Sequence, residues 1–343
     1  MIEKVSIVIP VYNNPQGLAR TLASIERLAD DNFEVIVVDD ASTLSYEGIC
    51  DSKNVRLIRL GENSGPGFAR NEGVRSAGGE ILAFTDSDCT VPSDWLAKIR
   101  RGLKDPSMVA VAGSYSGEHA TGLISWTRFL EASYYHLKQK ALVNSFITAN
   151  FAMRRRVFEE VGGFPKAWFG EDLMLGIKLK AKGLSVLWLP DLLVGQYFRP
   201  TVTAYVRQQF HWSSAVALIS AKYPQTQTLT WSVKRGSLLS QLLLEAGLLV
   251  SPLFLEGAVF VYFLVFGLLG LLGLNLPFLI YVSKKRSLGT AIGIWMVTLF
   301  GRNPAWFSGC LWALFSHPRV MLSGLAKMVW RGAPIPCREG EAS

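Results

Sequence analysis

Two acidic residues separated by a serine, Asp86 and Asp88, follow directly after the apolar run 81–84. Such a short run bounded by polar residues is typical of a strand buried on both faces. In an open α/β sheet, ligands bind at the carboxyl ends of the strands. Two carboxylates placed there repel each other unless positive charge lies between them. The pair therefore predicts a divalent cation, Mg²⁺ or Mn²⁺, that holds a phosphate-bearing substrate. A solvated turn capped by Asp86 is the alternative.

The elements that must position these acids alternate between strand and helix patterns. Strands are predicted at 5–12, 33–38, 55–60 and 81–84. Asn14 and Pro15 should begin the first helix, as its N-cap and first residue. Strand and helix in repeated alternation are typical of a parallel sheet with helices on both faces. The first two hundred residues are therefore predicted to form an α/β domain with a doubly wound, mostly parallel, Rossmann-like sheet.

A glycine turn at 63–67 leads into a further predicted helix that carries Arg70. Backbone N–H groups at such a turn can bind an anion, and Arg70 can add a bidentate contact. A tight loop with a surface arginine is the equally plain alternative. The glycines do not indicate a dinucleotide site, because that fingerprint follows the first strand directly. A hydride-transfer enzyme is therefore disfavoured.

Four segments taken in order resemble the family 2 inverting glycosyltransferases, which have the GT-A fold and use nucleotide-sugar donors. They are Ser-Ile-Val-Ile-Pro-Val-Tyr-Asn at 6–13, Val-Ile-Val-Val-Asp-Asp-Ala-Ser at 35–42, Gly-Phe-Ala-Arg-Asn-Glu-Gly at 67–73 and Thr-Asp-Ser-Asp-Cys at 85–89. The resemblance covers roughly 4–212. It implies that Asp88 is the more direct metal ligand, with Asp86 also at the metal and nearer the ribose or sugar.

The same resemblance assigns the nucleotide-binding residues. It implies that Pro10, Val11 and Tyr12 line the nucleotide base, and that Asp40 accepts a hydrogen bond from the N3–H of that base. Arg70 is implied to lie beside the nucleotide or its diphosphate. A nucleoside diphosphate is a poor leaving group until its growing negative charge is neutralised, which agrees with paired acids that hold a cation.

Glu171 and Asp172 are predicted to open a later helix, which follows a segment at 150–164 that resembles the acceptor-side segment of the family. Adjacent acids at a helix N-terminus usually serve as caps and complement the helix dipole. The resemblance instead implies that Asp172 is the general base that takes the proton of an acceptor hydroxyl. Glu171 would position that base or bind the acceptor. Met174 and Lys178 depart from the acid and arginine that family members often carry there.

Gln208, His211 and Trp212 share one face of a helix predicted at 201–221. They resemble the Gln-x-x-Arg-Trp motif of the family, with His211 in place of the arginine. The resemblance implies contacts with the acceptor or the donor diphosphate. Gln196 also departs from the family, where a histidine is often found. An interfacial helix with Trp212 at the lipid headgroups explains the pattern equally well.

The composition changes sharply along the chain of 343 residues. Residues 257–282 carry no charge and can cross a bilayer, and 238–255 are a second candidate span. The net charge of +8 is concentrated near these apolar segments, which favours an anionic membrane surface over nucleic acid. The four cysteines form no CxxC pair, which is typical of a reducing cytosol. No secretory signal peptide is predicted at the start.

These observations predict a GT-A domain at 1–222, a basic juxtamembrane linker at 223–236 and a two-helix transmembrane hairpin at 237–283. A re-entrant, interfacial or additional transmembrane segment is expected at 287–330, because Arg302 and Pro304 split it into short halves. Residues 331–343 are expected to form a tail. Lysines and arginines lie at both ends of the hairpin, just before its first span and just after its second. The positive-inside rule therefore places both ends, and with them the catalytic domain, in the cytoplasm. The expected location is the inner (plasma) membrane, as a multi-pass protein.

The predicted function is that of a membrane-anchored, metal-dependent, hexosyltransferase-type enzyme. It would move a sugar from a nucleotide-sugar donor to a hydroxyl of a lipid-linked saccharide or glycolipid, in polysaccharide or glycolipid assembly. A polyprenyl-phosphate glycosyltransferase is the nearest alternative, although a phosphate acceptor needs no base such as Asp172. The other alternative is a non-catalytic nucleotide-binding membrane protein, in which some of the motif acids should be lost.

Overall fold

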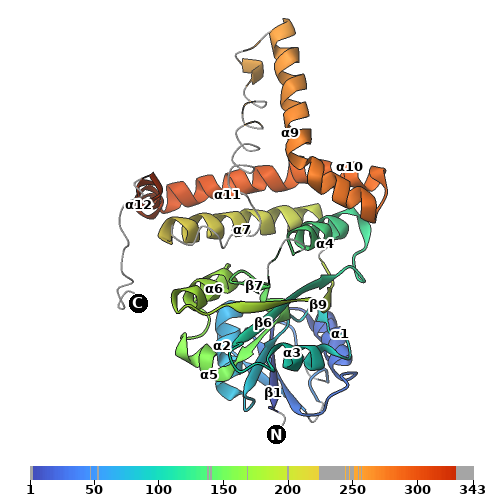
Figure 1. Cartoon of the computed structure of the whole chain (residues 1–343), viewed down its shortest axis with the longest axis vertical. Coiled ribbons are helices and arrows are strands. Elements are labelled where there is room, and N and C mark those ends of the chain that lie inside the picture. The colour runs from blue at the N-terminus through green and yellow to red at the C-terminus, as the bar shows by residue number, and fades with distance from the viewer. Residues whose placement is uncertain are drawn as a thin grey trace.

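A computed structural model gives the arrangement of the elements (Figure 1). It describes residues 3–46, 48–51, 54–136, 139, 141–167, 169–198, 201–223, 244, 247, 251–253, 255 and 257–329. The predicted linker from residue 224 to 236, most of the proposed first span at 238–255 and the tail at 331–343 lie outside the described residues.

Nine strands in the described part of the chain form one mixed sheet, in the order β3-β2-β1-β4-β8-β6-β9-β5 with β7 beside β9. The first four strands in that order are parallel to one another. Their bounds are β1 Val5–Val11, β2 Phe33–Asp39, β3 Val55–Arg59 and β4 Ile81–Phe84. These bounds confirm the predicted strands to within a residue, and parallel pairing places the ends of β1, β2 and β4 at one edge.

The prediction of a mostly parallel sheet is wrong for the second half, which is mixed. Strand β8 (Phe151–Arg154) runs antiparallel to both β4 and β6 (Ala110–Ser116), while β9 (Val186–Gln196) is parallel to β6. Short strands β5 (Cys89–Thr90) and β7 (Leu142–Val143) pair antiparallel with β9. Between β6 and β8 the chain passes through helix α4 and the short strand β7, and β8 then runs in the direction opposite to β6.

Helices flank the sheet and close its upper edge (Figure 1). Helix α1 begins as predicted: Asn14 accepts a hydrogen bond from the Gly17 N–H at 3.1 Å, and Pro15 is the first residue. The helices of this region are α1 Pro15–Ile25, α2 Pro66–Ser76, α3 Trp95–Gly102, α4 Gly122–His136, α5 Arg155–Glu160, α6 Glu171–Ala181 and α7 Val202–Lys222, with a 3₁₀ turn at Thr148–Asn150.

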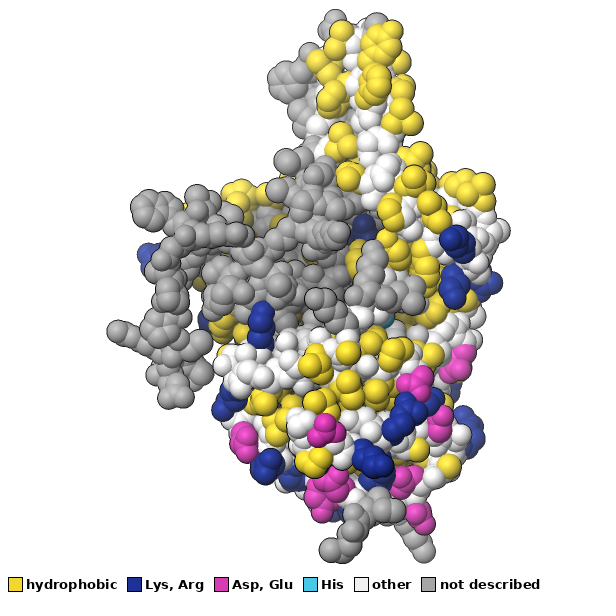
Figure 2. All heavy atoms as spheres, in the orientation of Figure 1, with side chains coloured by type: hydrophobic (Ala, Val, Ile, Leu, Met, Phe, Trp, Pro, Cys, Tyr) yellow, Lys and Arg dark blue, Asp and Glu magenta, His cyan; other side chains and the backbone are white. Residues whose placement is uncertain are grey.

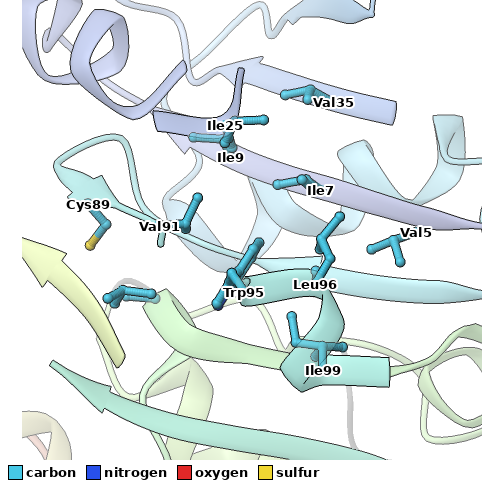
Figure 3. Close-up of a cluster of buried hydrophobic side chains, with 14 of the residues drawn as sticks. Val5, Ile7, Ile9, Ile25, Val35, Cys89, Val91, Trp95, Leu96 and Ile99 are labelled. Carbon is cyan, nitrogen blue, oxygen red and sulfur yellow. The ribbon is translucent and has the colours of Figure 1, made fainter. Parts of the chain in front are cut away.

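Two apolar clusters, one on each face of the sheet, hold these elements together. One joins β1 and β2 to α1 and α3, and Figure 3 shows Ile7, Ile9 and Trp95 within it. The Trp95 indole donates to the buried Asn150 side chain at 3.0 Å. Asn150 in turn donates to two backbone carbonyls, of Ser114 and Leu192. This buried amide therefore fixes β6, β9 and α3 relative to the strand ends.

The C-terminal segment contains α9 (Gly257–Lys285), α10 (Leu288–Val297), a π-helical turn (Thr298–Arg302), α11 (Asn303–Ser316) and α12 (Pro318–Val329). Figure 1 shows α9 rising away from the molecule, while α10 and α11 run crosswise to it and α11 lies along α7. Among the described residues, one helix, Val261–Lys285, is long and apolar enough to cross a membrane, with a mean hydropathy of 2.3.

The two short halves expected on either side of Arg302 and Pro304 follow one another as consecutive helical elements in the described structure. The π-helical turn places the Arg302 guanidinium against Glu131 of α4, with 3.0 Å between Nη1 and Oε1. The Tyr205 hydroxyl of α7 donates to the same carboxylate at 3.1 and 3.2 Å. Arg302, through Glu131, thus joins the C-terminal segment to α4 and α7.

We expect Arg302→Met to lower the stability of the protein by about 3 kcal/mol, since it leaves the Glu131 carboxylate largely buried without its cation. The double variant Glu131→Gln/Arg302→Met removes both charges and should lose markedly less stability. The measurement is thermal unfolding of both variants in detergent micelles. Equal losses for the two variants would show that Arg302 contributes through packing alone.

Candidate functional site

One cavity of about 740 Å³ lies between the sheet edge and the helices above it. Its walls include every residue predicted for the site except His211. From the strand ends and α2 come Pro10, Val11, Tyr12, Asp40, Arg70, Asp86 and Asp88; from α6 and α7 come Glu171, Asp172, Gln208 and Trp212. The fold therefore brings the predicted donor side and the predicted acceptor side into one space.

Arg70 joins these two sides through a pair of short ion pairs. Its Nη2 atom lies 2.6 Å from Asp86 Oδ1, and its Nη1 atom lies 2.8 Å from Glu171 Oε1. The guanidinium is almost fully buried, and the two carboxylates raise its pKa although burial itself lowers it. Because both terminal nitrogens are engaged, Arg70 positions the two acids and is not a free cation for a phosphate.

Asp40 anchors the glycine turn that precedes α2. Its two carboxylate oxygens accept hydrogen bonds from the Ser64 and Gly65 N–H groups, each at 2.8 Å. These two N–H groups therefore serve the fold, which removes them from the anion site considered above. Each carboxylate oxygen has a second lone pair, so Asp40 retains acceptor capacity toward the cavity that it lines.

Asp172 is the second residue of α6. The helix begins directly after Gly170, whose left-handed backbone (φ 78°) turns the chain into the helix. Burial, followed by repulsion from the Glu171 carboxylate, raises the pKa of Asp172 to about 7. Its Oδ1 atom accepts from the Leu173 N–H at 2.7 Å, which favours the ionised form. A carboxyl with a pKa near 7 can both accept and release a proton at neutral pH.

Asp88 and Asp86 are the residues available to a divalent cation. Among the described residues, no group of three or more histidines, cysteines, aspartates or glutamates is arranged to hold a metal. One carboxylate oxygen of Asp86 is paired with Arg70, and the carboxylates of Asp86 and Asp88 both line the cavity. Mg²⁺ sites in phosphate-binding proteins commonly use one or two carboxylates and complete the shell with phosphate and water oxygens. The donor set therefore fits a cation that binds together with a phosphate-bearing substrate.

The motif on α7 is only partly directed at the cavity. Gln208 and Trp212 line it, but His211 does not. The His211 ring stacks on Phe169 with 5.1 Å between ring centroids and an angle of 9° between the ring planes. Within the described structure, His211 is thus part of the packing between α7 and the loop before α6, and its predicted contact with acceptor or diphosphate is not supported by this geometry.

Several cavity residues were not predicted from the sequence. They come from β6, α4, β9 and the C-terminal helices, and include Tyr115, Arg128, Glu131, Tyr134, Tyr135, Phe198, Asn275, Phe278, Arg302 and Trp306. The signal for α4 was a helical spacing of apolar residues at 126, 129, 130 and 134. The signal for Arg302 was a lone charge in an apolar segment, which is usually paired inside a protein.

Comparison with known proteins agrees with this geometry. Residues 6–162 match the family described as Glycosyl transferase family 2. The pre-mycofactocin glycosyltransferase of Mycobacterium tuberculosis is 26% identical over 260 residues, which cover 71% of this chain and 53% of that protein. Glycosyltransferase AglE of Haloferax volcanii is 28% identical over 207 residues, or 57% of this chain and 67% of AglE.

The chain thus spans about half the length of the first of these relatives. Among solved structures, a mannosyltransferase from Pyrobaculum calidifontis, in complex with GDP-Man and Mn²⁺, is similar with a TM-score of 0.55 and 20% identity. The similarity covers 97% of this chain and 89% of the mannosyltransferase. It confirms the predicted GT-A fold.

Proposed function

We propose that the protein is a membrane-anchored, metal-dependent, inverting glycosyltransferase that acts on a hydroxyl of a lipid-linked saccharide or glycolipid. The observation that carries this proposal is that one cavity joins the strand-end acids, the Asp172 carboxyl and a wall formed by Asn275 and Phe278 of the apolar helix α9. The residues proposed to bind the donor, the proposed proton acceptor and the apolar helix α9 thus border the same cavity.

The donor side of this cavity suits a nucleotide sugar. Tyr12, which is half exposed, offers a ring face to a base, and Pro10 and Val11 supply an apolar wall. The mannosyltransferase that shares the fold was solved with GDP-Man and Mn²⁺. Asp88, with the remaining oxygen of Asp86, would hold Mg²⁺ or Mn²⁺ here. A cation so bound supplies positive charge to the diphosphate.

The acceptor side supplies the base. The acceptor oxygen forms a bond to the anomeric carbon from the face opposite the diphosphate, and Asp172 takes the hydroxyl proton as that bond forms. The bond from the anomeric carbon to the diphosphate oxygen breaks, and its electron pair leaves with the nucleoside diphosphate. The configuration at the anomeric carbon is therefore inverted. Glu171, held by Arg70, fixes the start of α6 and so the position of Asp172.

Helix α9 supports a membrane location. Figure 2 shows hydrophobic side chains gathered over it, and Val259, Tyr262 and Phe266 are 60%, 65% and 70% exposed. Apolar exposure on this scale marks a surface that contacts lipid or protein. Lys284, Lys285 and Arg286 follow at its C-terminal end. We propose that this end faces the cytoplasm, at the inner (plasma) membrane, on the same side as the catalytic domain.

The experiment that tests the proposed function is donor hydrolysis by the purified full chain in detergent, across a panel of nucleotide sugars with and without Mn²⁺. Release of nucleoside diphosphate from one class of donor, lost on chelation with EDTA, is the expected result. Binding of nucleotide without any release, over the whole panel and with lipid extract added, would favour the non-catalytic alternative.

The pH dependence of transfer provides a further prediction. Asp172 accepts a proton only when ionised, and its pKa is raised to about 7. We expect kcat/KM to fall as the pH decreases, with a midpoint at or below pH 7 because a bound cation favours the carboxylate. The measurement is kcat/KM from weakly acidic to weakly basic pH, with nucleotide affinity measured at each pH as the control. A rate that increases as the pH decreases would contradict the role of Asp172.

A further inference from the structure

Three arginines line the described cavity, and two of them are held by carboxylates. Arg70 pairs with Asp86 and Glu171, and Arg302 pairs with Glu131. Arg128, on α4, forms no ion pair with any carboxylate in the described part of the chain. A half-buried cation without a counter-charge, at the wall of a cavity, is suited to an anionic ligand.

The contacts of Arg128 place it on the side of Asp88. Its guanidinium carbon lies 5.6 Å from the centre of the Phe198 ring and 5.8 Å from that of Tyr205. The neighbour of Phe198 in the chain, Tyr197, donates its N–H to the Asp88 carbonyl at 2.9 Å. Arg128 therefore rests on a segment that is hydrogen bonded to the backbone of the proposed metal ligand.

Tyr115 connects the two groups from the other direction. Its ring packs edge-on against Phe198, with 5.4 Å between ring centroids. Burial, then Cys89, Asp86 and Asp88, raise the pKa of Tyr115, while Arg128 lowers it. The same phenol is thus within electrostatic reach of both the acids and the arginine, which agrees with the position that the ring contacts give.

We propose that Arg128 binds the diphosphate of the nucleotide and neutralises the negative charge that develops on it as the sugar leaves. This proposal rests on the proposed function and adds to it a residue outside the matched motifs. The diphosphate gains charge when the bond to the anomeric carbon breaks, so a guanidinium fixed beside it stabilises the transition state more than the ground state. Packing on Phe198 and Tyr205 holds the guanidinium in place before the donor binds, which reduces the cost of ordering it.

The position of His211 is consistent with this assignment. The helix α7 offers Gln208 and Trp212 to the cavity, but no cation, because the His211 ring is stacked on Phe169. Arg70 and Arg302 are already paired with carboxylates in the described cavity. The positive charge of Arg128 therefore remains for an incoming diphosphate.

The test compares the affinities of the full chain in detergent for UDP, GDP, uridine and guanosine, each with MnCl₂, by calorimetry. For Arg128→Gln we expect a loss of about tenfold or more in affinity for the nucleoside diphosphate that binds, the size of one charge-assisted contact, and unchanged affinity for the nucleoside. Arg128→Lys keeps the charge and should recover part of the loss. The control is Arg27→Gln, which makes the same change at an exposed residue outside the cavity lining.

Each other outcome overturns the assignment in a recognisable way. Equal losses for diphosphate and nucleoside would show that Arg128 only shapes the nucleotide pocket. Unchanged diphosphate affinity, together with weaker co-sedimentation of Arg128→Gln with phosphatidylcholine vesicles that contain phosphatidic acid, would assign Arg128 to a lipid phosphate. If the unaltered chain bound no nucleoside diphosphate of the donor panel, the proposed function itself would fail, whereas binding that is unaffected by Arg128→Gln would remove only this inference.

Discussion

Asp172→Asn is expected to reduce sugar transfer by about 10²–10⁴-fold, the usual contribution of a positioned general base. The substitution keeps the size and shape of the side chain and removes its basicity. Asp172 is in the first turn of α6 and is not one of the residues assigned to the nucleotide, so nucleotide affinity should be nearly unchanged. The measurement is the transfer rate and the nucleotide affinity of the same preparation. Asp31→Asn, at an exposed residue that does not line the cavity, is the matched control.

This variant also separates the proposed acceptor from its nearest rival. A hydroxyl with a pKa far above 7 must lose its proton as the new bond forms, whereas a phosphate acceptor is already ionised. For a polyprenyl-phosphate acceptor, Asp172→Asn should therefore change the rate only slightly. Near-normal transfer with intact nucleotide affinity would remove the base assignment and favour the phosphate acceptor.

Asp88→Asn is expected to reduce donor hydrolysis by about 10²-fold or more at limiting Mn²⁺, since one of two carboxylate ligands loses its charge. Raising the Mn²⁺ concentration should recover part of the activity, because the weakened site still fills by mass action. The measurement is the hydrolysis rate as a function of Mn²⁺ concentration, with Asp31→Asn as the control again. An Asp88→Asn variant with full activity in EDTA-treated buffer would show that no cation acts at this site.

Asp88 is a better probe of the metal than Asp86. Asp86 Oδ1 is 2.6 Å from Arg70 Nη2, so its replacement would also release Arg70 and, through it, Glu171. A loss of activity in an Asp86 variant would then have two causes, a weaker metal site and a displaced α6. The Asp88 carboxylate accepts from the Cys89 thiol, with 3.7 Å between Sγ and Oδ1, and its replacement leaves the ion pairs of Arg70 with Asp86 and Glu171 in place.

Much of the donor half could be predicted from the sequence because its determinants are local. The apolar runs of β1, β2 and β4, the Asn14 cap and the helix start at Glu171 are each encoded within a few neighbouring residues. Acids that directly follow parallel strands meet at one edge by topology, so the meeting of Asp40 and Asp86 at one cavity needed no long-range information.

The parts that were missed depend on contacts between distant residues. Arg302 pairs with Glu131, which is 171 positions away in the sequence, and Arg70 pairs with Glu171, which is 101 positions away. No local pattern reports such pairs, so neither ion pair could be predicted from the sequence. The direction of β8 was missed for a similar reason, because it depends on where α4 carries the chain after β6.

His211 shows the limit of motif transfer at the scale of one side chain. Residues 208, 211 and 212 share a helix face in any α-helix, and the sequence predicts that face correctly. Whether a ring on that face points into a cavity depends on its neighbours, and here Phe169 provides a stacking partner. The cation that we assign to the diphosphate comes instead from α4, as Arg128.

The central claim is that one cavity holds a nucleotide sugar between the strand-end acids and Asp172. The most direct test is a structure of the full chain with Mn²⁺ and the nucleoside diphosphate that the hydrolysis panel selects. We expect the base to lie against Tyr12 beside Asp40, the cation between Asp88 and the diphosphate, and the Arg128 guanidinium on a phosphate oxygen. A nucleotide bound outside this cavity, or a diphosphate directed away from Asp88, would contradict it.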